Sequence, residues 1–201
     1  MRKIGIMGGT FDPVHNGHLM LADTAYRLDQ VWFLPNGNPP HKKEENIGTD
    51  ARHRSRMVAL AIQGRDYCRL EEYEVRRREV SCSYQTLEHF RKQYPEDEFY
   101  FIIGADSLFA IETWVHPERI FPACVILAAC RDDHDSLEEM KAQVGHLKTV
   151  YPKARIRLLR SPLIPVSSSE IRRKIRAGLS IAEEVPGEVE AYIKEEELYE
   201  P

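Results

Sequence analysis

The chain has 201 residues, 42% of them hydrophobic and 30% charged, which is typical of a globular protein with one well-packed domain and at most a small second one. Its formal net charge is −4 and its sequence pI is about 6.1, so no overall basic field favours nucleic acid or an anionic membrane. The apolar runs are too short for a membrane span or a signal peptide, and we therefore expect a cytoplasmic protein.

Short apolar runs alternate with longer segments of helical periodicity. The alternation predicts an α/β fold: a Rossmann-like, doubly wound parallel sheet flanked by helices. The predicted strands are 3–7, 31–34, 99–103, 124–129 and 156–159, and the predicted helices between them are 18–28, 51–62, 83–94 and 136–151.

The segment after residue 166 differs from the rest. It predicts a helix that begins at a run of serines and ends at Gly178, followed by an acidic helix that starts near Pro186. We expect residues 1–166 to form the Rossmann-like core, and residues 167–201 to be a C-terminal helical segment that completes the same domain. The four cysteines form no C-x-x-C pair, so free thiols are expected rather than a disulfide or a zinc site.

The stretch GGTFDPVHNGH, residues 8–18, lies between the first predicted strand and the first predicted helix. Gly8 and Gly9 let the backbone approach a ligand, and a helix start offers N–H groups and a dipole that favour an anion. His15 and His18 there are compatible with a metal site, a phosphate site or an ordinary turn. The metal interpretation lacks further ligands, because Asp12 is the only acid nearby, so a phosphate site is favoured.

The stretch VSSSEIRRKI, residues 166–175, combines a serine-rich helix start with a cluster of cations. Alone it is compatible with a polyanion site or with a solvated basic helix face. Together the two stretches resemble the two signatures of the nucleotidyltransferase superfamily, which binds the triphosphate of ATP or CTP. The resemblance implies that His15 and His18 hold phosphates, that Arg172 clamps the β- and γ-phosphates, and that Gly8, Gly9, Thr10, Phe11, Ser168 and Ser169 also contact ATP.

Three further stretches resemble the bacterial nicotinate-nucleotide adenylyltransferase family: NPPHK (38–42), SYQTLEHF (83–90) and FIIGADSLFAIETW (101–114). The resemblance adds Gly104 and Asp106 to the ATP site. It implies that Thr10, Asp12, Lys42, Tyr84, Thr86 and Trp114 contact nicotinate mononucleotide, with Trp114 stacked on the pyridine ring. Two departures concern the mononucleotide pocket: the loop CRDDHD (130–135) replaces a glycine-containing turn, and Gln85 stands where a threonine is usual.

The implied reaction is attack by the phosphate of nicotinate mononucleotide on the α-phosphorus of ATP, which releases pyrophosphate. The nucleophile is already an anion, so catalysis needs positioning and charge stabilisation by His18, His15, Lys42 and Arg172. Mg²⁺ is expected to arrive with ATP rather than in a protein metal site. The alternatives are a phosphopantetheine adenylyltransferase or glycerol-phosphate cytidylyltransferase type of enzyme, or a non-catalytic nucleotide sensor on the same fold. No nucleic-acid or membrane partner is expected, and a homodimer or larger homo-oligomer is left open.

Overall fold

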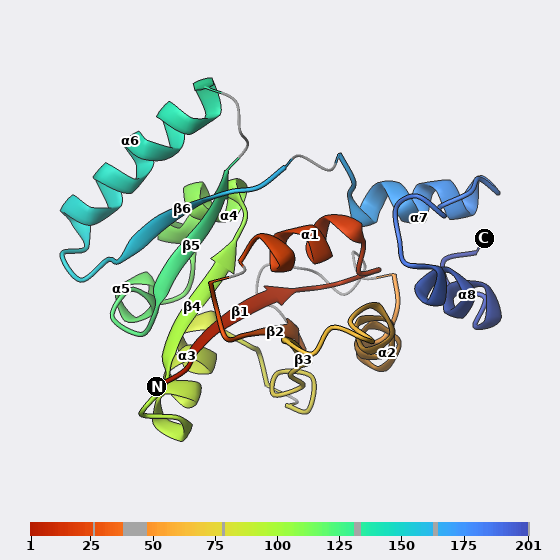
Figure 1. Cartoon of the computed structure of the whole chain (residues 1–201), viewed down its shortest axis with the longest axis horizontal. Helices are drawn as coiled ribbons and strands as arrows, with labels where there is room; N and C mark the ends of the chain where they lie inside the picture. The colour runs from red at the N-terminus through yellow and green to blue at the C-terminus, as the bar shows by residue number, and fades with distance from the viewer. Residues whose placement is uncertain (26, 38–47, 78, 131–133, 163–164, 201) are drawn as a thin grey trace.

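Figure 1 shows the chain as a computed structural model. The structure describes residues 1–25, 27–37, 48–77, 79–130, 134–162 and 165–200. The described residues contain a single six-stranded sheet, and every strand pairing in it is parallel. The strands are β1 (Lys3–Gly9), β2 (Gln30–Pro35), β3 (Cys68–Leu70), β4 (Glu98–Ile103), β5 (Val125–Cys130) and β6 (Ile156–Arg160).

The helices connect successive strands or follow the last one. They are α1 (Asn16–Thr24), α2 (Ala51–Ala61), α3 (Ser83–Gln93), α4 (Ala105–Ala110), α5 (Pro117–Ile120), α6 (His134–Val150), α7 (Ser168–Arg176) and α8 (Gly187–Glu195), with a 3₁₀ turn η2 (Ile111–Thr113) after α4. None of the described helices is long and apolar enough to cross a bilayer.

The expected α/β fold is confirmed, with all five predicted strands present. Strand β3 was not predicted because it has only three residues, too few for an apolar pattern. The first helix runs over 16–24 rather than 18–28. The four cysteines all lie in the described ranges and form no disulfide there.

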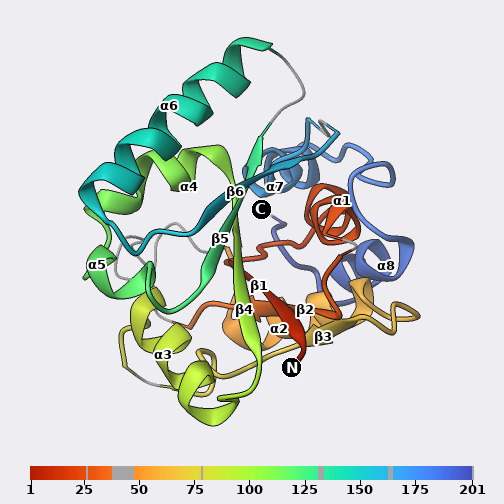
Figure 2. The same cartoon turned by 60° about the vertical axis from the view of Figure 1, so that its left-hand side comes forward.

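The sheet buries both faces under helices, because apolar residues in neighbouring positions of a strand point to opposite sides. In β2, Val31 and Phe33 belong to a buried cluster that includes residues of α1, α2, α7 and α8, whereas Trp32 and Leu34 belong to one that includes residues of α3, α4, α5 and α6. Figures 1 and 2 show α6 on one side of the sheet and α7 and α8 on the other. The residues after 166 therefore share a hydrophobic cluster with β1, β2 and α2.

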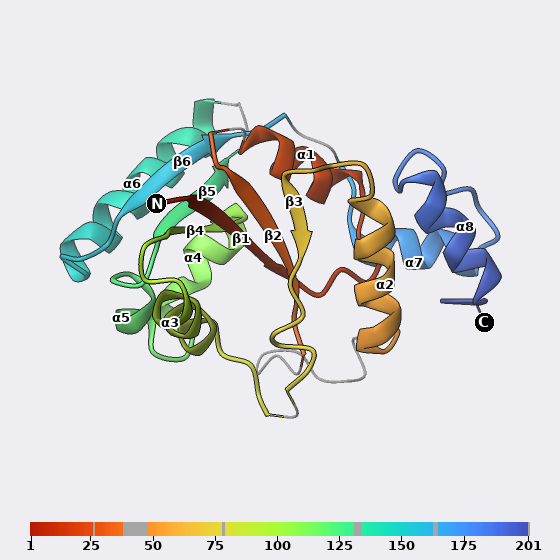
Figure 3. The same ribbon diagram turned by 60° about the horizontal axis from the view of Figure 1, so that its bottom comes forward.

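The strand order is β3-β2-β1-β4-β5-β6, so the connections run outward in one direction from β1 and in the other from β4. Between these two central strands the sheet has its topological switch point, and ligands in such sheets bind outside the carboxyl ends of the strands there. Figure 3 shows β1, β2 and β3 side by side, with α2 beside them. The GGTFDPVH stretch follows β1 at this edge.

Candidate functional site

A cavity of about 370 Å³ lies at the carboxyl ends of β1, β2 and β4. Its lining joins the β1 end to the segment before α3 and to the turn after α4. The lining residues are Ile6, Gly8, Gly9, Thr10, Leu34, Asn36, Glu74, Ser81, Cys82, Ser83, Thr86, Leu87, Phe101, Ser107, Trp114 and Val115. The volume suits a small ligand. Of the predicted contacts, Gly8, Gly9, Thr10, Thr86 and Trp114 reach this cavity.

The polar side of the cavity is organised by Glu74, whose side chain is only 6% exposed. Its carboxylate accepts a hydrogen bond from Thr86 Oγ1 at 2.7 Å and another from the Gly37 backbone N–H. Burial raises the pKa of Glu74, and these hydrogen bonds and nearby Arg77 partly offset the rise. Because the single hydroxyl proton of Thr86 points at Glu74, this hydroxyl faces the cavity as an acceptor only.

Two polar atoms of the lining lack a hydrogen-bond partner among the described residues. They are Asn36 Oδ1 and Ser81 Oγ, both shielded from solvent. Helix α3 begins beside them with Cys82 as its N-cap, whose side chain makes no capping hydrogen bond. The first backbone N–H groups of α3 therefore remain donors for a bound acceptor.

The apolar side of the cavity carries aromatic rings. Trp114 lies 6.1 Å from Phe101, centroid to centroid, with the two rings edge to face. Tyr84, expected among the mononucleotide contacts, lies elsewhere: its ring packs under the Arg119 guanidinium at 4.3 Å and beside His116. Tyr84 is the second residue of α3, and from that position its side chain turns toward α5, so Cys82 and Ser83 take the place on the cavity wall.

The two histidines stack at the start of α1, with ring centroids 3.7 Å apart. The His15 backbone N–H donates to His18 Nδ1 at 3.2 Å, so a neutral His18 carries its proton on Nε2. The Phe11 ring packs edge-on against His18 at 4.9 Å and covers Gly9, where any Cβ would clash with it. The histidine pair is thereby connected to the cavity wall through Phe11 and Gly9.

Both imidazoles are held neutral. Burial lowers the pKa of His15 to about 4, and burial together with the neighbouring His15 lowers the pKa of His18 well below its ordinary value. Near pH 7 each ring therefore has one N–H donor and no charge. Such a pair can donate to phosphate oxygens without gaining or losing a proton.

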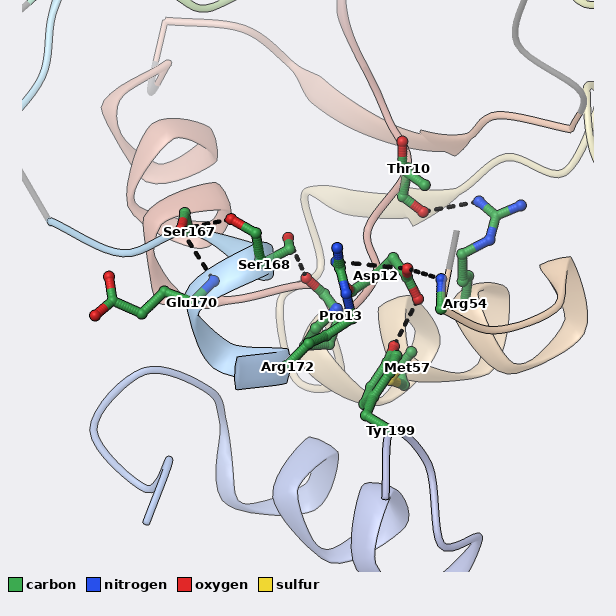
Figure 4. A network of polar contacts seen from close by, with 12 residues as sticks. Thr10, Asp12, Pro13, Arg54, Met57, Ser167, Ser168, Glu170, Arg172 and Tyr199 are labelled. Carbon is green, nitrogen blue, oxygen red and sulfur yellow. Dashed lines mark hydrogen bonds and ion pairs between the residues drawn. The ribbon is translucent and has the colours of Figure 1, made fainter. Parts of the chain in front are cut away.

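Helix α7 brings the second signature stretch to the first. Its N-cap is Ser167, whose Oγ accepts from the Glu170 N–H at 3.3 Å. Ser168 Oγ donates to the Pro13 carbonyl at 2.9 Å, and Ser169 is exposed beside it. Arg172 Nη1 donates to the Asp12 carbonyl at 2.7 Å (Figure 4). Residues about 160 positions apart in sequence thus meet directly.

Asp12, expected to contact the mononucleotide, does not line the cavity. Its side chain is buried, and its two oxygens accept hydrogen bonds from the Gly48 N–H and the Tyr199 hydroxyl. Gly104 and Asp106, expected at the ATP site, are exposed at the start of α4, with Gly104 as the N-cap. Lys42 lies outside the described residues.

Sequence reasoning missed Arg54, a buried cation beside the cavity that is 1% exposed. It donates from Nη1 to the Thr10 carbonyl at 2.7 Å (Figure 4) and from Nη2 to the Asn36 carbonyl at 2.8 Å. Burial lowers the pKa of Arg54, with Asp12 and Tyr199 acting in the opposite direction. Arg54 therefore joins the ends of β1 and β2, which both contribute to the lining.

Comparison with known proteins places this chain among enzymes of one type. The cytidylyltransferase-like family matches residues 6–174. A protein of Lachnoclostridium phytofermentans named probable nicotinate-nucleotide adenylyltransferase is 40% identical over 202 residues, which cover 99% of this chain and all of that protein. A Bacillus licheniformis protein of the same name is 36% identical over 203 residues, with all of both chains covered.

Solved structures share the fold. Plasmodium falciparum nicotinic acid mononucleotide adenylyltransferase complexed with NaAD matches with a TM-score of 0.80 at 21% identity, covering 99% of this chain and 98% of that one. The structure of the same enzyme complexed with APC matches with a TM-score of 0.79 at 21% identity and the same coverage.

Proposed function

The chain belongs to the cytidylyltransferase-like family and, within it, to the nicotinate-nucleotide adenylyltransferases, and on this premise we propose how its site works. It is an adenylyltransferase of NAD biosynthesis that transfers AMP from ATP to nicotinate mononucleotide, giving nicotinate adenine dinucleotide and pyrophosphate. The observation that carries the assignment of residues is the direct contact between the two signature stretches, through Ser168 to Pro13 and Arg172 to Asp12.

The triphosphate binds between the starts of α1 and α7. His18 and His15 donate to oxygens of the α- and β-phosphates, and Arg172 holds the departing pyrophosphate. Arg172 has Nη1 committed to the Asp12 carbonyl, which orients the remaining N–H groups of the guanidinium toward an anion. The exposed N–H groups at the start of α7 add further donors.

The mononucleotide occupies the cavity, with its pyridine ring against Trp114. Its carboxylate is received by backbone N–H groups at the start of α3, because the Thr86 hydroxyl already donates to Glu74. Lys42 guides the attacking phosphate. In this arrangement backbone N–H groups, rather than a cationic side chain, select the nicotinate acid over the amide.

The chemical step needs no protein base. The mononucleotide phosphate is an anion at neutral pH, it attacks the α-phosphorus in line with the bond that breaks, and pyrophosphate leaves with the electron pair. ATP enters as its Mg²⁺ complex. Among the described residues no group of three or more His, Cys, Asp or Glu side chains could hold a metal, so ATP phosphates and water are the expected ligands.

A substrate panel tests this function. Purified protein is mixed with Mg²⁺ and either ATP or CTP, and with nicotinate mononucleotide, nicotinamide mononucleotide, phosphopantetheine or glycerol phosphate, and pyrophosphate is measured. We expect rapid release only with ATP and nicotinate mononucleotide. A preference for the amide would contradict the backbone-donor site. Nucleotide binding without any release would instead identify a sensor.

A further inference from the structure

Asp12 lies at the centre of a buried network, three residues before His15 in the sequence, and is 2% exposed. Tyr199 donates its hydroxyl proton to Asp12 Oδ1 at 2.8 Å, and the Gly48 N–H donates to Oδ2 at 2.6 Å. The Arg172 Nη1 atom lies 3.5 Å from the same Oδ2. In Figure 4, Tyr199 approaches Asp12 from one side and Arg172 from another. One carboxylate therefore connects α7, the segment before α2 and the turn after α8.

The segment around Tyr199 is docked rather than frayed. Tyr199 is 7% exposed and its neighbour Leu198 is also buried, both within the cluster that includes Met57. Glu197 and Tyr199 have positive φ angles of 51° and 67°, a region that costs free energy for residues other than glycine. Segments beyond a last helix are usually poorly ordered, so this strained turn must be held by its contacts.

The Tyr199 ring packs closely against the backbone of Gly48. A Cβ added to Gly48 would lie 2.9 Å from Tyr199 Cδ1 and 2.9 Å from Arg172 Cδ. Gly48 therefore lets its N–H reach Asp12 while the tyrosine ring and the arginine stem pack against its backbone. The three residues form one contact around the carboxylate.

The same network holds the turn that carries Phe11. Phe11 has a φ of +52°, a strained value, and its ring lies against His18. The carbonyls on either side are fixed by guanidinium groups: Thr10 O by Arg54, and Asp12 O by Arg172. Strained backbone of this kind persists only where the surroundings hold it. Freeing Asp12 would loosen both the turn before His15 and the orientation of Arg172.

We propose that Tyr199 is a positioning residue of the triphosphate site, which it serves from outside by fixing Asp12 and, through Asp12, the Phe11 turn and Arg172. The inference rests on the proposed function for its activity readout only. Its effect should fall mainly on ATP and less on the mononucleotide, because Asp12 itself does not line the cavity.

The test compares Tyr199→Phe with Tyr192→Phe. Tyr192 lies in α8, and its replacement by Phe likewise removes one hydrogen bond, to His53 Nδ1 at 2.8 Å. Tyr192 does not contact Asp12. We expect Tyr199→Phe to lower kcat/KM for ATP about tenfold, because Arg172 and the Phe11 turn lose part of their support, with a smaller change in KM for the mononucleotide. Tyr192→Phe should keep both parameters.

Thermal unfolding is recorded for both variants, and kinetics are measured where both are folded. If Tyr199→Phe only lowers the unfolding midpoint and keeps kcat/KM for ATP, the role is structural and the proposal is overturned. The proposal is also overturned if KM for the mononucleotide rises by as large a factor as kcat/KM for ATP falls.

A double-mutant cycle tests the route through Asp12. In an Asp12→Ala background, adding Tyr199→Phe should change kcat/KM for ATP by less than about twofold, because the residue through which Tyr199 acts is gone. A full tenfold further loss would show that Tyr199 acts independently of Asp12 and would refute the proposal.

Binding of a non-hydrolysable ATP analogue, measured by calorimetry, separates this inference from the proposed function. Tyr199→Phe should weaken the analogue about tenfold, and Tyr192→Phe should not. If the wild-type protein releases no pyrophosphate with any mononucleotide, the proposed function fails, and this comparison alone decides the role of Tyr199. If the wild type and Tyr199→Phe bind the ATP analogue with equal affinity, the proposed role of Tyr199 is overturned.

Discussion

Acid should destabilise the protein through the buried histidine pair. His15 is 8% exposed, and burial lowers its pKa to about 4, whereas an unfolded chain binds the proton near pH 6.5. Between these two values the unfolded state holds more protons than the folded one, so the free energy of unfolding falls as the pH is lowered through this window. At about 1.4 kcal/mol per pH unit, the loss attributable to His15 is about 3 kcal/mol and is complete below about pH 4. Above pH 6.5 the contribution of the neutral His15 to the free energy of unfolding is fully present.

Urea unfolding at several pH values between 7 and 4.5 measures this loss. Carboxylates titrate in the same range, so the informative quantity is the difference between the wild type and His15→Gln. That variant should lose less stability than the wild type between pH 7 and 4.5, by up to about 2.5 kcal/mol. His146→Gln removes a surface histidine of α6 and serves as the control. Parallel stability curves for the wild type and His15→Gln would refute the assignment of a buried neutral imidazole.

Three further changes test the site. His18→Ala should lower kcat by about 10²–10³-fold while circular dichroism shows an unchanged fold, because one donor to the phosphates is lost; near-normal turnover would contradict its role. Trp114→Ala should raise KM for the mononucleotide about tenfold through loss of stacking. A rise in KM for ATP instead would show that Trp114 does not contact the mononucleotide. Arg54→Met should cost about 2–5 kcal/mol in urea unfolding, because two buried carbonyls lose their donors. Arg56→Met, on the exposed face of the same helix, is its matched control and should cost less than about 0.5 kcal/mol.

The sheet could be predicted because its strands are buried on both faces and therefore read as continuous apolar runs. The place of the site also followed from the sequence, since the glycine pair ends β1 at the edge where parallel strands bind ligands. Strand β3 could not be found in this way, because a three-residue edge strand carries too little pattern.

The residues that sequence reasoning missed depend on tertiary contacts. Arg54 looks like one of several arginines on a polar helix, yet it lies on the face of α2 that also buries Met57, Val58 and Ala61. That helical spacing was a signal that could have identified it. Glu74 gives no such signal, because it lies in a charged stretch and becomes buried only when Gly37 and Thr86 meet it.

Within the α3 segment Tyr84 was predicted to contact the mononucleotide because SYQTLEHF resembles the family's motif at that place. The helix starts at Ser83, so the residues that face the cavity are those at and before its first turn, together with Thr86 one turn later. The start of this helix was predicted at the residue where it occurs, but the side of its first turn that faces the cavity depends on how α3 packs against α5, which the sequence does not give. The role of Tyr199 could not be predicted from sequence either, because its hydrogen-bond partner Asp12 lies 187 residues away.

The central claim is that the mononucleotide phosphate attacks the α-phosphorus of ATP in a site formed by the starts of α1 and α7. The most direct measurement uses nicotinate mononucleotide with oxygen-18 in its phosphate, and the products are separated and analysed by mass spectrometry. The account predicts that all of the label stays in nicotinate adenine dinucleotide, with unlabelled pyrophosphate formed in equal amount. Label in the pyrophosphate, or pyrophosphate without dinucleotide, would contradict it.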